Sequence, residues 1–139
     1  PGAEVYVQST SARSQRLGAL VYEKTFDYLA SIENISWVSR SDAGVIQVLN
    51  SQGSDAYGMI RRPTTPSILL ELGYLSNPQE AELMTTDTYV KNISKAIAAG
   101  AQSFLTTDNT VSDSANKVRI YNPGPGLSSR SCDDALAMP

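Results

Sequence analysis

The order of apolar and polar positions predicts a strand and then a helix at the start of the chain. Residues 4–8 contain the β-favouring residues Val5, Tyr6 and Val7, which are typical of a strand. From Arg13 to about Ile32, apolar residues recur at spacings of three and four, which indicates one helical stripe. A hydroxyl among residues 9–11 is expected to cap this helix. A strand followed by a helix is the opening of an α/β unit.

The middle of the chain is weakly patterned, apart from a short apolar element at Val45–Leu49. Tyr57–Ile60 is predicted as a short strand, and the proline-containing residues 61–66 as a loop. Ser67–Gly73 has the strongest strand signal, because it contains a continuous apolar run. Such a run is typical of a strand that is covered on both faces, as in parallel sheets.

Two helices are predicted after this strand. The first begins at Asn77–Glu80, where Asn at the N-cap, Pro at N1 and Glu at N3 form a capping-box pattern. The second carries an amphipathic stripe from Tyr89 to Phe104 and is expected to pack against the sheet. The pattern as a whole predicts an α/β domain.

The composition changes from Thr106 onward. This segment has few large apolar residues and contains the turn signal Asn-Pro-Gly-Pro-Gly at residues 122–126. We interpret residues 1–105 as the folded portion, and 106–139 as a linker or poorly ordered tail in which Val118–Tyr121 forms one isolated strand.

The composition excludes several classes of chemistry. The chain has 139 residues, a net charge of −3, no histidine and one cysteine. No clustered basic face for nucleic acid is predicted, and no apolar run approaches the length of a membrane span. Without histidine there is no His-based triad, and Cys132 alone forms neither an intrachain disulfide nor a metal cage. Chemistry carried by this chain alone would therefore use carboxylates, hydroxyls, Lys or Arg.

Glu71 is the main candidate for a catalytic residue. It follows the apolar run of the predicted strand and precedes Gly73, and functional residues gather at the carboxyl ends of strands in open α/β sheets. Apolar surroundings disfavour a charged carboxylate unless a cation compensates, so we predict a general base or acid. The alternative is a solvated or salt-bridged carboxylate with a structural role.

Arg61 and Arg62 follow the predicted strand at residues 57–60. One of them is expected to pair with Glu71 or to bind a substrate carboxylate through a bidentate contact. The alternative is that both are solvated loop arginines.

The segment Pro66–Glu80 resembles the catalytic-glutamate motif of the zinc-dependent N-acetylmuramoyl-L-alanine amidases, which are bacterial cell-wall hydrolases. Their pattern, Pro-x-x-Leu-x-Glu-x-Gly-Phe-x-Ser-Asn-Pro, is matched with Tyr74 in place of Phe. The resemblance covers about residues 1–105. It includes Gly2–Tyr6, Tyr57–Arg61, and a degraded form of Asp-Arg-Gly-Val at Asp42–Val45.

The resemblance implies a three-layer α/β fold, a sheet sandwiched by helices, of which this chain is expected to be an incomplete copy that lacks the N-terminal part. It implies hydrolysis of the amide bond between N-acetylmuramic acid and L-alanine in peptidoglycan, in the cell wall, the periplasm or outside the cell. It also implies Zn²⁺ held by two His and one Glu upstream of the segment that matches Pro1, so that no metal ligand belongs to this chain. The catalytic role carries over to Glu71 alone, as the general base and acid acting on a zinc-activated water. Arg61 matches a position that is often Arg in the family, and we predict that it binds substrate.

Two other functions remain compatible with the sequence. One is a peptidoglycan-binding remnant that lacks zinc and does not catalyse. The other is a small α/β ligand-binding domain outside the family, which would leave the long motif at residues 67–80 unexplained. Under the amidase interpretation, the chain alone is expected to be inactive.

Overall fold

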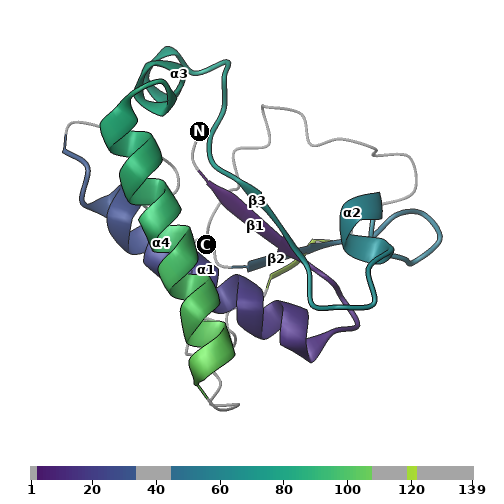
Figure 1. The fold of residues 1–139 in the computed structure, drawn as a ribbon. Coiled ribbons are helices and arrows are strands. Elements are labelled where there is room, and N and C mark those ends of the chain that lie inside the picture. Colours follow the sequence, from purple (N-terminus) through teal and green to yellow (C-terminus); the bar gives the residue numbers. More distant parts are fainter. Residues whose placement is uncertain (1–2, 34–44, 108–118, 122–139) are drawn as a thin grey trace.

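The computed structural model describes residues 3–33, 45–107 and 119–121. These residues form an α/β fold, as the sequence predicts (Figure 1). The elements follow one another as β1 (Glu4–Val7), α1 (Ala12–Ala30), β2 (Val45–Val48), α2 (Gly58–Arg61), β3 (Ile68–Glu71), α3 (Pro78–Met84), α4 (Asp87–Thr106) and β4 (Arg119–Tyr121).

The sheet has the strand order β3-β1-β2-β4. β1 and β2 are parallel, as are β2 and β4, whereas β3 is antiparallel to β1. The prediction of a parallel strand covered on both faces at residues 67–73 was therefore wrong. Among the described residues β3 has β1 as its neighbour on one side and no strand on the other, so its apolar side chains are half-buried rather than buried.

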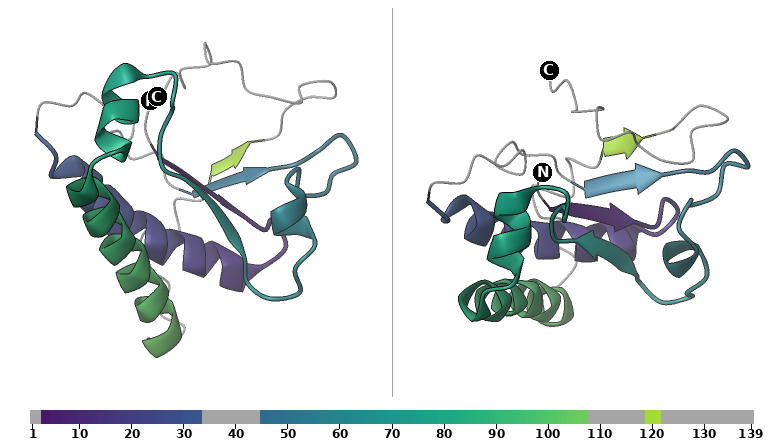
Figure 2. Two further views of the ribbon diagram at one scale, coloured as in Figure 1. Left: turned by 45° about the horizontal axis from the view of Figure 1, so that its top comes forward. Right: turned by 90° about the horizontal axis from the view of Figure 1, so that it is seen from above.

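The two faces of the sheet have different neighbours (Figure 2). On one face Val5, Val7 and Val45 form an apolar cluster with residues of α1. The close approach of α1 depends on Gly18, since a Cβ there would lie 2.3 Å from Val7 Cγ1. On the other face Ile60 of α2 packs with side chains of β1 and β2. The sheet is thus layered between helices.

The prediction of a strand at Tyr57–Ile60 was wrong, because these residues begin a single helical turn. The carbonyl oxygen of Tyr57 accepts hydrogen bonds from the backbone N–H groups of Ile60 (3.0 Å) and Arg61 (2.9 Å). This turn buries Ile60 against the sheet and leaves Met59 60% exposed. Four residues are too few for the sequence to show whether their apolar period is that of a helix or of a strand.

Both long helices begin at hydroxyl caps, as expected for Ser and Thr at this position. Ser11 Oγ accepts from the N–H of Ser14 (3.2 Å), and Thr86 Oγ1 accepts from the N–H of Tyr89 (3.3 Å). α4 packs chiefly along α1 rather than directly on the sheet, which corrects the prediction for the last helix. The two helices meet closely at Gly100, where a Cβ would lie 2.5 Å from the Cα of Val21.

The segment beyond Thr106 contributes one strand to the described structure. β4 pairs with β2 through Ile46 and Arg119 and the two residue pairs that follow, so the strand predicted at Val118–Tyr121 exists but is not isolated. Of the predicted tail, Thr106 ends α4 and Thr107 is its C-cap. Residues 108–118 and 122–139, which include Cys132, lie outside the described residues, as do residues 42–44. The domain boundary at 105 stays a prediction. In the part of the chain that the structure describes, no helix is long and apolar enough to cross a membrane.

Candidate functional site

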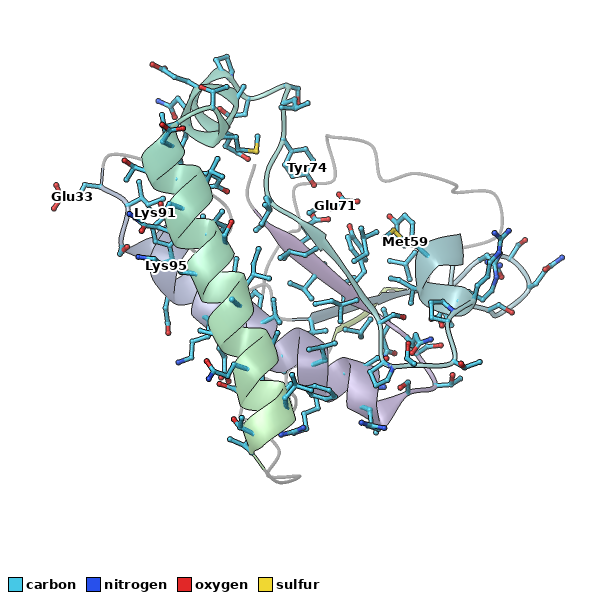
Figure 3. The ribbon with its side chains drawn as sticks, viewed as in Figure 1. Glu33, Met59, Glu71, Tyr74, Lys91 and Lys95 are labelled. Carbon is cyan, nitrogen blue, oxygen red and sulfur yellow. The ribbon has the colours of Figure 1, made fainter. Side chains whose placement is uncertain are left out.

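Glu71 is the last residue of β3, and its side chain is exposed. Its partner in the antiparallel register is Glu4, the first residue of β1. Because β3 is antiparallel, its carboxyl end lies beside the amino end of β1. Glu71 therefore does not lie at the carboxyl edge of a parallel sheet, and the rule that places functional sites at that edge does not explain its position. Figure 3 shows Glu71 and Tyr74 on the same side of β3, away from α4.

Two tyrosines hold the carboxylate of Glu4. The hydroxyl of Tyr74 donates to Glu4 Oε1 at 2.9 Å, and the hydroxyl of Tyr6 donates to Glu4 Oε2. The ring of Tyr6 meets the ring of Tyr57 edge-on, with centroids 5.1 Å apart. Two carboxylates, Glu4 and Glu71, and three tyrosine rings therefore lie near one end of the paired strands β1 and β3.

The loop after Glu71 is fixed by the buried side chain of Glu80 in α3. Glu80 Oε2 accepts from the N–H of Tyr74 at 2.8 Å, and Oε1 accepts from Asn77 Nδ2 at 2.9 Å. The capping-box prediction is correct for Asn77, whose Oδ1 accepts from the N–H of Gln79 at 3.0 Å. It is wrong for Glu80, because the N–H of Asn77 donates to the carbonyl of Tyr74 instead. Glu80 thus anchors the loop rather than closing the box.

Two further contacts hold the chain between Glu71 and Tyr74. Tyr89 of α4 donates from its hydroxyl to the carbonyl oxygen of Leu72 at 3.2 Å. Gly73 lies against Glu80, since a Cβ at Gly73 would be 2.8 Å from Glu80 Oε2. The two helices that follow β3 therefore set the position of the segment that carries Tyr74.

The surroundings of Glu71 make its carboxyl easier to protonate than a solvated one. Partial burial, followed by the negative charge of Glu4, raises the pKa of Glu71 above its usual value. The pKa of Tyr6 is also raised, first by burial and then by its hydrogen bond to Glu4, so Tyr6 stays a hydroxyl donor. A raised pKa brings the two protonation states of this carboxyl closer in free energy at neutral pH, which suits proton transfer.

Arg61 is the last residue of α2, and its side chain points back to the loop before that helix. Its Nη1 donates to the carbonyl oxygens of Asp55 (2.7 Å) and Ala56 (3.4 Å). An arginine paired with Glu71 would lower the pKa of that carboxyl, whereas the pKa is raised. The expected pairing with Glu71 is therefore not found, and the role of Arg61 in substrate binding stays a prediction.

The residues around Glu71 do not fit a zinc ion. Protein zinc sites use three or four N, S or O ligands close together, and both oxygens of Glu4 already accept hydrogen bonds from tyrosines. Among the described residues, no group of three or more Cys, Asp or Glu side chains lies close enough to hold a metal ion.

Sequence reasoning missed Glu4, Tyr6 and Tyr74 as site residues. A signal was available for the first two, because alternation along a strand places residues 4 and 6 on one face. Their meeting with Glu71 depends on strand pairing between distant segments, which no local pattern encodes.

The chain belongs to the N-acetylmuramoyl-L-alanine amidase family: residues 1–103 match the family model Amidase_3, described as N-acetylmuramoyl-L-alanine amidase. The resemblance found at residues 66–80 is thereby confirmed. The family match and the layered α/β sheet together show that the chain is of the amidase class.

Three curated relatives share parts of the chain. N-acetylmuramoyl-L-alanine amidase AmiC from Neisseria meningitidis is 35% identical over 51 residues, which are 37% of this chain and 12% of AmiC. Probable N-acetylmuramoyl-L-alanine amidase AmiB from Haemophilus influenzae is 29% identical over 91 residues, 66% of this chain and 18% of AmiB. Probable cell wall amidase LytH from Staphylococcus saprophyticus is 26% identical over 106 residues, 74% of this chain and 35% of LytH. The chain thus spans only a minor part of each relative.

A solved structure has the same fold. The CwlD amidase from Clostridioides difficile, determined in complex with the GerS lipoprotein, superimposes with a TM-score of 0.58 at 26% identity. The match covers 77% of this chain and 47% of the CwlD chain. The similarity confirms the α/β fold class.

Proposed function

We propose that this chain is the part of a peptidoglycan amidase domain that supplies the proton-transferring carboxylate, Glu71. The family as a whole supports hydrolysis of the amide between N-acetylmuramic acid and L-alanine. The observation that carries the assignment is the place of Glu71: exposed at the end of β3, opposite a second carboxylate, with a raised pKa.

The reaction assigns Glu71 two steps. A water oxygen adds to the lactyl carbonyl carbon, and Glu71 takes the proton that this water loses. The C–N bond then breaks, and Glu71 gives the proton to the leaving nitrogen of L-alanine. The products are a carboxylic acid on the muramic acid and a free α-amino group on the peptide.

The zinc that the family resemblance implies is assigned to ligands outside this chain, two His and one Glu of an upstream segment. Those residues would complete the domain, and the chain itself contains no histidine. The proposed location of the complete enzyme is the cell wall or periplasm, where peptidoglycan lies.

Product analysis tests the proposal. Insoluble peptidoglycan is incubated with the complete domain and with the 139-residue chain, and new α-amino groups on alanine are quantified. We expect release of stem peptides by the complete domain and none by the chain alone. If the complete domain sediments with peptidoglycan but exposes no new amino groups, it is a binding protein and the amidase proposal is wrong.

A further inference from the structure

The opposing carboxylates are fixed by the sheet rather than by chance contact of two surface chains. Glu4 and Glu71 are direct partners in the antiparallel pairing of β1 and β3. Directly opposite residues of such a pair have Cβ atoms roughly 4.5–5.5 Å apart and project from the same face. The register therefore keeps the Cβ atoms of Glu4 and Glu71 close together.

Glu4 has less freedom than Glu71. Its two oxygens accept from the hydroxyls of Tyr74 (2.9 Å) and Tyr6. Tyr6 is itself buried, 4% exposed, and packed against Tyr57. Glu4 is therefore a carboxylate held in one place by rigid donors, and Glu71 is the exposed partner that faces it.

We propose that Glu4 is a positioning residue for the candidate catalytic Glu71: held by Tyr6 and Tyr74, its carboxylate stabilises the protonated form of Glu71. This inference rests on the function proposed above for Glu71. Like charges at this separation disfavour simultaneous ionisation, so Glu4 brings the proton-accepting and proton-donating forms of Glu71 closer in free energy near neutral pH.

The other groups near Glu71 do not supply the same effect. Tyr6 and Tyr57 are phenols; burial and, after it, the charge of Glu4 raise the pKa of Glu71. Arg61, on α2, donates to the carbonyl oxygens of Asp55 and Ala56. Glu4 is thus the group whose removal should change the titration of Glu71.

Carboxyl ¹³C NMR on the 139-residue chain labelled at glutamate tests the coupling without requiring activity. In Glu4→Gln we expect the titration midpoint of Glu71 to fall by about half a pH unit at low salt. Glu82→Gln, which removes an exposed charge from α3, is the matched control and should leave the midpoint unchanged. An unchanged midpoint in a folded Glu4→Gln chain overturns the proposal.

The wild-type chain gives a second test that does not depend on the folding of the Glu4 variant. The Glu4 resonance should respond over the pH range in which Glu71 titrates, and this response should vanish in Glu71→Gln. A Glu4 resonance that is insensitive to Glu71 also overturns the proposal.

The complete domain links the coupling to turnover. Glu4→Gln should shift the pH profile of kcat toward lower pH, whereas a merely structural role would lower the melting temperature and leave the profile in place. If the NMR coupling is found but Glu71→Gln keeps full activity, the proposed function of Glu71 fails while the positioning of its carboxyl by Glu4 stands.

Discussion

Replacing Glu80 by alanine should destabilise the fold and release the loop that follows Glu71. Glu80 is fully buried, and its two carboxylate oxygens accept from the backbone N–H of Tyr74 and from Asn77 Nδ2. Alanine removes both acceptors. The N–H of Tyr74 then loses its partner, and Asn77 loses the contact that orients its capping side chain.

The size of the effect follows from these two bonds. A hydrogen bond to a charged group contributes about 1.5–3 kcal/mol, and leaving a buried donor unpaired costs about 1–3 kcal/mol. The bond to Asn77 contributes less, because this residue is only half-buried and water can replace the lost acceptor. Part of the loss is offset because alanine removes a buried carboxylate, whose desolvation is itself unfavourable. We expect a net destabilisation of about 2–4 kcal/mol.

Urea unfolding of the 139-residue chain measures this quantity. Glu80→Gln keeps the size of the side chain and one acceptor, so it should lie between wild type and Glu80→Ala. Glu82→Ala is the control on the same helix, and as an exposed change it should alter the free energy of unfolding by less than about 0.5 kcal/mol. A Glu80→Ala chain as stable as the Glu82→Ala chain would refute the loop-anchoring role.

Three further results are expected. Gly100→Ala should destabilise the chain by about 1–3 kcal/mol in urea, although alanine favours a helix by about 1 kcal/mol, because the added Cβ meets the backbone of α1 at Val21; a stabilised variant would contradict the packing. Glu71→Gln should stabilise the chain by roughly 0.2–1 kcal/mol at pH 7: the raised pKa of Glu71 means that protonation favours the folded state, so wild type loses stability as pH rises through that pKa. The gain should disappear in thermal melts below about pH 4, and a gain that persists there would be inconsistent with a charge effect. Equilibrium dialysis of the 139-residue chain should find no sub-micromolar zinc site, since the sequence has no histidine and one cysteine.

Local chemistry made the helices predictable. Ser11, Asn77 and Thr86 each cap a helix by accepting from N–H groups two or three residues ahead, so the signal and the structure lie within one turn. The same holds for the strand at residues 68–71, whose apolar run is visible in the sequence. The prediction for residues 58–61 was wrong because four residues are too few to show whether the apolar period is that of a helix or of a strand.

The features that the sequence did not predict depend on contacts between residues far apart in the chain. The direction of β3 and its place at the edge of the described sheet depend on pairing with β1, a segment far away in the chain. The same pairing brings Glu4 to Glu71, so the motif identified one carboxylate and could not identify the other. The orientation of Arg61 depends on the carbonyl oxygens of Asp55 and Ala56, which only the folded loop presents.

The turnover of a complete amidase domain carrying Glu71→Gln tests the central claim most directly. On one preparation, kcat for release of stem peptides is measured beside zinc content, melting temperature and binding to peptidoglycan. We expect kcat to fall by about 10²–10⁴-fold, while zinc content and binding to peptidoglycan stay close to wild type and the melting temperature does not fall, because Gln keeps the shape of Glu and removes the proton transfer. A kcat near that of wild type would contradict the assignment of Glu71 as the proton-transferring residue.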